Sequence, residues 1–254
     1  MILIKESNVR YPHHTEKSLN RIDALGKKGI DIFAKYNIQF VSCGKANYGI
    51  SWHGEPVPDI PLNKTVLYKA EPPIYNIYFG RKLNNPDFMK QYMAVISDYI
   101  IDDFPVVHCN LSMEFDFVQR YFDQKKTEFL CMVLRNKTFG IFLNSLVPSF
   151  RKYKSHSNMK MRKIFDNDMC DFLGPEKYHS YGRGWNKKCF RGEVGIWGNL
   201  TIFSLHKFTL AFENSCFNGY VTEKMLYPMF AGSIPIYLGA PDVEKYVPKD
   251  VVYR

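Results

Sequence analysis

The stretch from Phe212 to Pro241 constrains the fold more than any other part of the chain. Phe208, Leu210 and Phe212 alternate with Thr209 and Ala211, which is the period-two pattern of a strand with one buried face. The polar run Glu213-Asn214-Ser215 ends that pattern, and the apolar run 234–238 indicates a second, buried strand. Because a helix start lies between them, the stretch predicts a strand–helix–strand unit of an α/β protein.

The helix start carries an acid–base pair. Thr222 is placed to cap the helix, Glu223 suits the positive end of the helix dipole, and Lys224 lies in the first turn. Free backbone N–H groups and an ammonium group therefore converge, which predicts a pocket for phosphate oxygens. Gly232 supplies the left-handed residue that stops the helix, and Pro228 inside it predicts a bend near Lys224.

The functional meaning of this helix start depends on what precedes it. A Thr-Glu-Lys helix start is common in α/β proteins that bind nothing there. The pair Glu213-Asn214 strengthens the case for a site, because open α/β sheets bind ligands beyond the carboxyl ends of their strands. The stretch thus predicts a site for an anionic, sugar-bearing ligand.

These residues resemble the donor-binding signature of the α1,3/α1,4-fucosyltransferases, glycosyltransferase family ten. The shared pattern is F-E-N-S, then Y-V-T-E-K, a helix, and G-x-I-P-I. Elsewhere, Glu71-Pro72-Pro73 resembles an element of the family's N-terminal domain, and 129–136 resembles the strand that opens its donor domain. Arg162 and the loop Tyr181-Gly182-Arg183-Gly184 also have counterparts in the pattern. The resemblance is strong over 129–241 and thin before it.

The resemblance implies a fold of two Rossmann-like α/β domains facing a cleft, the arrangement called GT-B. We expect an acceptor-side domain over residues 1–124 and a GDP-fucose-binding donor domain over residues 125–254. The family's chain continues past a segment like Val247-Pro248-Lys249-Asp250, whereas this chain stops at Arg254. We therefore expect a donor domain that lacks its closing elements.

The resemblance also implies an activity: inverting transfer of L-fucose from GDP-fucose to a hydroxyl of an N-acetylglucosamine-containing glycan, in α1,3 or α1,4 linkage. Glu71 would be the general base, Arg162 and Lys224 would bind the diphosphate, and Glu223 would bind a ribose or sugar hydroxyl. Fixed cations there stabilise charge that grows on the leaving group in the transition state. The other implied donor-binding residues are Asn214, Tyr220, Gly182 and Arg183.

The first third of the chain is less informative. Val66–Tyr68 predicts a short strand that leads to Glu71, and Pro72-Pro73 biases Glu71 toward an extended backbone. Runs at 38–43 and 96–104 predict two further strands. Without the resemblance, Glu71 would be a solvated loop carboxylate.

Metal chemistry finds little support in the sequence. We expect no cofactor beyond the donor, and a divalent cation would stimulate the reaction without a protein site. Asp166-Asn167-Asp168 has the D-x-D form of metal-dependent glycosyltransferases of another fold, but it does not follow a buried strand, so we predict a helix end or surface turn. The six cysteines form no C-x-x-C pair, which favours buried thiols and, by default, a reducing compartment.

The formal net charge of +9 suits a nucleotide sugar, an anionic membrane surface or nucleic acid. No helix-turn-helix, RNP or zinc-finger pattern is present, so we expect no nucleic-acid partner, and peripheral membrane contact through basic residues. The chain shows no signal peptide and no apolar stretch approaching the ~20 residues of a membrane span. We expect a cytoplasmic or inner-membrane-peripheral protein if it is bacterial, and the Golgi lumen if it is a fragment of a eukaryotic protein.

Three alternatives stay open at this point. One is a non-catalytic nucleotide-sugar or glycan-binding relative, and another is a glycosyltransferase that uses a different GDP-sugar. The third is a basic nucleic-acid binder, which would show a steep salt dependence of binding to duplex DNA.

Overall fold

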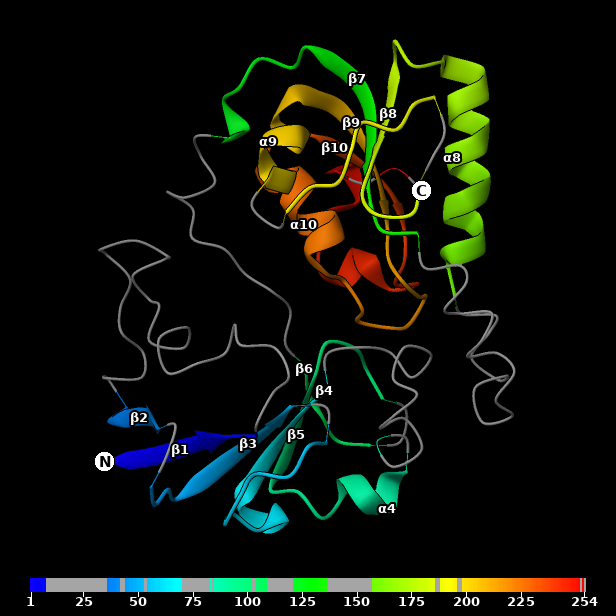
Figure 1. Ribbon diagram of the computed structural model, residues 1–254. Helices are drawn as coiled ribbons and strands as arrows, with labels where there is room; N and C mark the ends of the chain where they lie inside the picture. Colours follow the sequence, from blue (N-terminus) through cyan, green and yellow to red (C-terminus); the bar gives the residue numbers. More distant parts are fainter. Residues whose placement is uncertain are drawn as a thin grey trace. The chain divides into compact units, whose positions relative to one another are not determined.

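The computed structural model describes residues 1–7, 36–41, 44–52, 54–69, 83, 85–101, 104–108, 121–136, 157–185, 188–195, 198–251 and 253. The chain divides into two compact units, Met1–Cys109 and Asn110–Arg254 (Figure 1). This division comes earlier than the expected one between residues 124 and 125. The segment just before that point packs with the second unit, because Tyr121 packs against the cluster of Cys131, Leu200, Phe203 and Ala231.

The first unit contains a parallel sheet of strand order β2-β1-β3-β4-β5-β6. Its strands are β1 (Ile2–Glu6), β2 (Ile38–Val41), β3 (Tyr48–Trp52), β4 (Thr65–Lys69), β5 (Ala94–Ser97) and β6 (Val107–His108). The helical segments described here are η2 (Leu62–Lys64) and α4 (Pro86–Met89). One core cluster of this unit comprises Leu67, Leu83, Met89, Tyr92 and Val95.

Two of the three strands predicted in this unit are confirmed, as β2 and β4. The third was expected over 96–104, but β5 ends at Ser97. The chain bends there because side chains form local hydrogen bonds. The Ser97 hydroxyl accepts from the Tyr99 backbone N–H, and Asp98 accepts from the hydroxyl of Tyr68 at 2.8 Å.

The second unit contains a parallel sheet of strand order β10-β9-β7-β8. Its strands are β7 (Glu128–Val133), β8 (Tyr178–Tyr181), β9 (His206–Phe212) and β10 (Ile234–Leu238). Its helices are α8 (Met159–Leu173), α9 (Gly198–Leu205) and α10 (Glu223–Phe230), with the 3-10 segments η5 (Val243–Lys245) and η6 (Lys249–Val251). The strands predicted from Phe208 and from Ile234 are confirmed.

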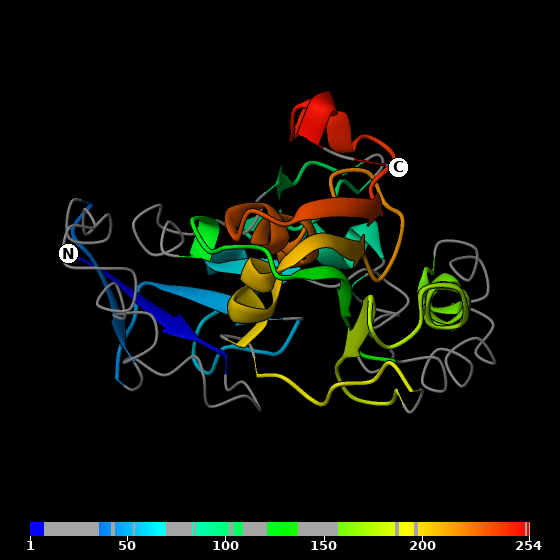
Figure 2. The ribbon, with the colours of Figure 1, turned by 90° about the horizontal axis from the view of Figure 1, so that it is seen from above.

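Helices cover both faces of this sheet. Leu130, Met132 and Phe212 share a cluster with residues of α8, whereas Cys131 and Ala211, one position away along β7 and β9, pack toward α9 and α10. In both views α8 is separated from α9 and α10 by strands (Figures 1 and 2). A parallel sheet with helices on both faces is the Rossmann-like α/β arrangement expected from the sequence.

Helix α8 turns one side toward the core. Met161 and Ile164 are 38% and 37% exposed, whereas Phe165 packs against the core beside Phe212. The helical period also turns inward Met159, Arg162, Asp166 and Cys170. The prediction of a helix end or surface turn at Asp166 is therefore wrong: Asp166 lies in mid-helix, buried, and its carboxylate accepts from the hydroxyl of Tyr178 at 2.8 Å.

Both predicted ends of the next crossover helix are confirmed. The Thr222 side chain accepts from the backbone N–H of Lys224 and caps α10. Gly232 follows the helix in a left-handed conformation with φ of 71°. Pro228 lies inside α10 and is buried.

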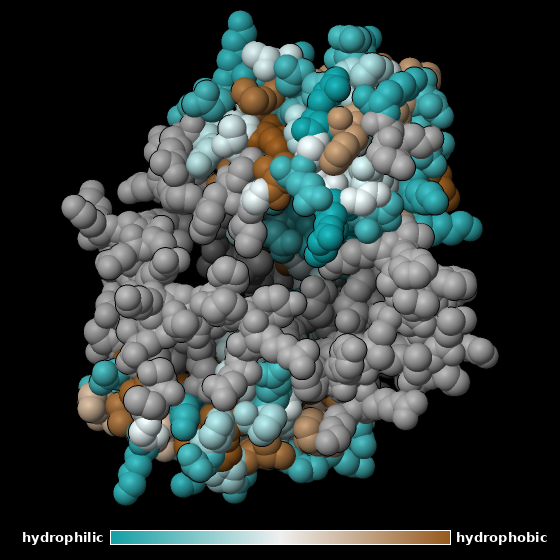
Figure 3. Space-filling view, viewed as in Figure 1, coloured by the Kyte–Doolittle hydropathy of each residue, from teal (hydrophilic) through white to brown (hydrophobic). Residues whose placement is uncertain are grey.

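On the face of the second unit drawn in Figure 3, apolar residues lie interspersed among hydrophilic ones. The thiols of Cys131, Cys170 and Cys189 are free and buried, as predicted for Cys131. Burial raises the pKa of the Cys131 thiol to about 12, so this thiol is protonated and unreactive. Across the described ranges, no helix combines the length and the apolar character needed to cross a membrane.

Candidate functional site

The connections of the second sheet identify where a ligand crevice forms. β7 leads through α8 to β8 on one side, while β9 leads through α10 to β10 on the other. β7 and β9 are neighbours, so the strand order reverses between them. In open α/β sheets the crevice beyond the carboxyl ends of such a pair is the usual binding site.

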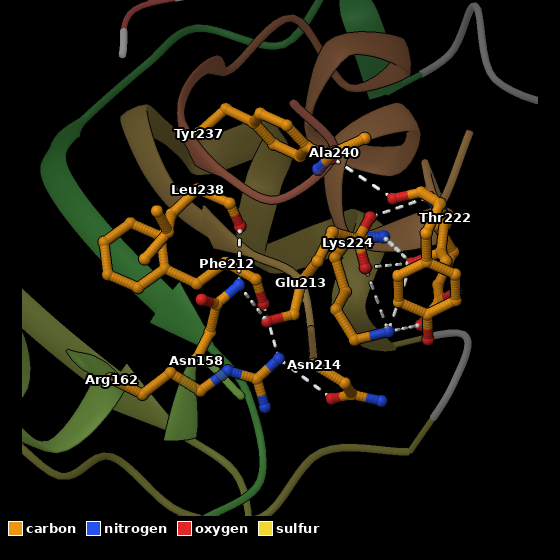
Figure 4. Close-up of polar contacts among 12 residues, drawn as sticks. Asn158, Arg162, Phe212, Glu213, Asn214, Thr222, Lys224, Tyr237, Leu238 and Ala240 are labelled. Atoms are coloured by element: carbon orange, nitrogen blue, oxygen red, sulfur yellow. Dashed lines mark hydrogen bonds and ion pairs between the residues drawn. The ribbon is translucent and has the colours of Figure 1, made fainter. Parts of the chain in front are cut away.

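Arg162 reaches this point from the first turns of α8. Its Nη2 donates to the carbonyl of Phe212, the last residue of β9, at 2.5 Å and to Asn214 Oδ1 at 2.9 Å (Figure 4). Arg162 is 1% exposed, so its charge is held among protein dipoles rather than in water. The structure thus brings together two of the residues that the sequence had singled out.

Asn158 ties the same region together and was missed by our sequence analysis. Its backbone N–H donates to the Asn214 carbonyl, and its Nδ2 donates to the carbonyls of Glu213 at 3.1 Å and Leu238 at 3.4 Å. It occupies the N-cap position of α8 without capping through its side chain. An asparagine before a helix predicts a cap, so local sequence gave no sign that its amide would join two strand ends.

Glu213 forms the centre of the site and was not among our candidates. Its carboxylate is fully buried and accepts from the backbone N–H and the hydroxyl of Thr222, both at 2.7 Å (Figure 4). Lys224 Nζ lies 3.8 Å from Glu213 Oε2. Burial raises the pKa of Glu213 to about 7, because desolvation outweighs the attraction of the Lys224 ammonium.

Lys224 and Glu223 form an ion pair in the first turn of α10. Lys224 Nζ donates to Glu223 Oε1 at 2.6 Å and to Thr222 Oγ1 at 3.1 Å. Burial opposes the charged form of Lys224, but the carboxylates of Glu223 and Glu213 outweigh it, so its pKa is raised. Burial likewise opposes ionisation of Glu223, but Lys224 outweighs it and lowers the Glu223 pKa. An ammonium group is therefore maintained at the start of α10.

Tyr220 precedes the helix cap by two residues, and its side chain is buried, 2% exposed. Its carbonyl accepts from the hydroxyl of Tyr237, and that hydroxyl accepts from the backbone N–H of Ala240. Gly239 passes close by: a Cβ on Gly239 would lie 2.5 Å from Cγ of Glu213. The end of β10 is thus pressed against the buried carboxylate.

A pocket of about 390 Å³ opens at the carboxyl ends of β7 and β8. Its lining residues are Val133, Leu134, Arg135, Gly182, Arg183, Glu193, Val194 and Asn199. Gly182 has φ of 110°, and a Cβ there would lie 2.5 Å from the Leu134 carbonyl oxygen. Only glycine permits this approach. Gly182 and Arg183, two of the residues predicted to bind the donor, both line this pocket.

Glu71 lies outside the described residues, so its role as general base stays a prediction. Among the described residues, no cluster of three or more His, Cys, Asp or Glu side chains could hold a metal ion.

Comparison with known proteins finds similarity over most of the second unit. Residues 153–252 match the family model described as "Glycosyltransferase family 10 (fucosyltransferase) C-term". The chain is 45% identical over 49 residues to GDP-fucose protein O-fucosyltransferase 3 of Xenopus tropicalis, covering 19% of this chain and 10% of that relative. It is 51% identical over 45 residues to an Alpha-(1,4)-fucosyltransferase of Arabidopsis thaliana, covering 18% and 11%. The matched segments thus span about a tenth of each curated relative.

The fold is shared with solved structures. A crystal structure of alpha1,3-fucosyltransferase aligns with a TM-score of 0.59 and 16% identity, covering 99% of this chain and 72% of that one. A crystal structure of alpha1,3-fucosyltransferase with GDP aligns with a TM-score of 0.55, also at 16% identity, covering 96% of this chain and 70% of that one. At this identity the likeness establishes the fold, and the predicted α/β class with parallel sheets is confirmed.

Proposed function

We propose that this chain acts as a fucosyltransferase that uses GDP-fucose, because residues 153–252 match the model of the C-terminal domain of glycosyltransferase family 10. The observation that carries the proposal is the pairing of cations at one crevice. Arg162 and Lys224 lie on different helices, and both reach the residues that follow β9. Two positive side chains and a capped helix start suit a diphosphate.

The chemistry follows from this charge arrangement. When the bond between the anomeric carbon and the β-phosphate oxygen breaks, negative charge grows on the diphosphate. Arg162 and Lys224 stabilise that charge without the cost of reorganising water, since both are held by hydrogen bonds beforehand. In the proposed single displacement, the acceptor oxygen attacks the anomeric carbon as its proton passes to Glu71. The configuration at that carbon is thereby inverted.

The pocket at β7 and β8 is the proposed site for the nucleoside end of the donor. Neighbouring strands lie about 4.8 Å apart, so β8 is roughly 10 Å from β9 along the same edge of the sheet. That separation suits a nucleotide whose phosphates meet residues after β9. Gly182 and Arg183 would contact the nucleoside there, while Asn214 and Tyr220 support the phosphate end.

The acceptor we propose is a hydroxyl of an N-acetylglucosamine-containing glycan, in α1,3 or α1,4 linkage. A second candidate is a hydroxyl of a protein side chain. It is favoured by the 45% identity to a relative named as a protein O-fucosyltransferase. Assaying transfer of labelled fucose to both acceptor types distinguishes them.

The test of the function combines binding with turnover. We expect the protein to bind GDP-fucose and transfer fucose, and Lys224→Ala to weaken donor binding at least tenfold. Lys249→Ala, at a lysine whose side chain is 79% exposed, is the matched control and should bind normally. Binding without turnover would indicate a non-catalytic relative. Stronger competition by GDP-mannose than by GDP-fucose would indicate another sugar, and no binding of either would refute the proposal.

A further inference from the structure

We propose that Glu213 is a positioning residue for the donor diphosphate, which holds Thr222 and Lys224 in place and takes up one proton when the diphosphate binds. This inference rests on the proposed function and adds to it a residue and a linked protonation. Glu213 itself does not touch the donor in this proposal. It acts through the two residues that it contacts.

The hydrogen bonds define the positioning role. Glu213 is the first residue after β9, and Thr222 is the N-cap of α10. The carboxylate of Glu213 accepts two hydrogen bonds from Thr222, and the Thr222 hydroxyl in turn accepts from Lys224 Nζ at 3.1 Å. One buried side chain therefore fixes both the start of the helix and the place of its ammonium group.

The carboxylate has no solvent to share its charge. Glu213 is 0% exposed, and Thr222 is 5% exposed. Gly239 closes the side toward β10, where a Cβ would lie 2.5 Å from Glu213 Cγ. Water cannot screen an added charge at this position. An added charge is therefore compensated by a change of protonation in the neighbouring protein groups.

The charge balance predicts which group responds. Lys224 Nζ stands between two carboxylates, 2.6 Å from Glu223 Oε1 and 3.8 Å from Glu213 Oε2. A diphosphate adds negative charge beside the same ammonium group. Glu213 is the more buried carboxylate, and its neutral form still accepts from the Thr222 N–H through one oxygen. Protonation of Glu213 therefore removes the excess charge while keeping the helix cap.

Other charged and titratable side chains surround this cluster. On the elements packed around Glu213 these are Glu223 and Lys224 of α10, Arg162 of α8, Cys216 of the loop after β9 and Tyr237 of β10. Glu213 stands apart from them because burial brings its pKa to about 7. At pH 7.5 it is roughly three-quarters ionised before the ligand arrives.

Calorimetric titration with GDP-fucose tests the inference on the full chain. The donor sugar diphosphate neither gains nor loses a proton near neutral pH, so protons taken up from the buffer are bound by the protein. Titrations in two buffers of different ionisation enthalpy give the number of protons bound. We expect uptake of about 0.7 proton at pH 7.5 and almost none at pH 5.5, where Glu213 is already neutral.

Variants assign the proton to this residue. Glu213→Gln should bind with almost no proton uptake at either pH, whereas Glu244→Gln, at a carboxylate whose side chain is 46% exposed, should behave as the wild type. Unchanged uptake in Glu213→Gln overturns the inference.

A second measurement needs no variant. Between pH 7.5 and 8.5 the wild-type affinity for GDP-fucose should weaken by up to about tenfold. A flat affinity profile, or binding without proton uptake at pH 7.5, overturns the inference while the proposed function stands. Failure of the wild type to bind GDP-fucose at any pH refutes the proposed function first.

Discussion

Replacing Glu213 by glutamine is expected to remove a specific pH dependence from the stability of the protein without ligand. The Glu213 pKa is raised from 4.5 to about 7 in the folded protein because its carboxylate is fully buried. A raised pKa means that the folded state binds the proton more tightly than the unfolded chain does. The contribution to stability is therefore fully present below pH 4.5, falls as the pH rises, and is lost above about pH 7.

The size of the effect follows from the shift. One pKa unit corresponds to about 1.4 kcal/mol, so the change between pH 4.5 and pH 8 is about 3 kcal/mol. Glutamine is neutral throughout and has no such change. It keeps one amide oxygen to accept from Thr222, so the fold should survive. Relative to the wild type, the variant should therefore gain about 3 kcal/mol in unfolding free energy from low to high pH.

Urea unfolding followed by circular dichroism, at several pH values between 4.5 and 8, measures this difference. Other titrating groups are common to both proteins and largely cancel in the comparison. Glu244→Gln serves as the control, because its side chain is 46% exposed, and its stability difference should stay within about 0.5 kcal/mol at every pH. If the difference between Glu213→Gln and the wild type were constant across this range, our account of the buried carboxylate would be refuted.

Three further changes test other parts of the site. Gly239→Ala should lower the unfolding free energy by about 1–3 kcal/mol, because the new Cβ would overlap the hydroxyl end of Tyr237 and meet Glu213 Cγ at 2.5 Å; unaltered urea unfolding would contradict this close approach. Thr222→Val should cost about 1–2 kcal/mol in the same assay, since it removes the cap of α10 and a bond to Glu213, whereas Thr222→Ser should restore most of it. Glu71→Gln should reduce turnover by a factor of about 10²–10⁴ while the dissociation constant of GDP-fucose stays unchanged; weakened donor binding would argue against its role as the base.

Local patterns located β9, α10 and β10 of the second unit but not its buried polar groups. Period-two alternation located β9, and the cap at Thr222 located the start of α10, because both depend on neighbouring residues. The sequence marked Glu213 as a polar residue at the end of a strand and beside a site, but not as a buried one. Its burial depends on Thr222 and Gly239, which come from segments that the fold brings to it. No window of sequence contains that information.

Asp166 shows the same limit in another place. Its partner, the hydroxyl of Tyr178, lies beyond the end of the helix. The sequence therefore suggested a surface turn at Asp166, whereas the structure has a buried carboxylate that accepts a hydrogen bond there. Arg162 was predicted through the resemblance to a family, because the densely basic segment around it gives little that distinguishes it from its neighbours. Its 1% exposure and its bonds to Phe212 and Asn214 are properties of the assembled sheet.

Asn158 gives the site a mechanical property. Its amide donates to the ends of β9 and β10, while its own backbone begins α8, so one side chain joins three segments that are distant along the chain. Opening any one of them breaks bonds that the other two also need. Slowly exchanging amide protons at Asn158, Glu213 and Arg162 should therefore exchange with similar opening free energies, as one cooperative unit. A crevice built this way stays shaped for its ligand before the ligand arrives, and it loosens only as a whole.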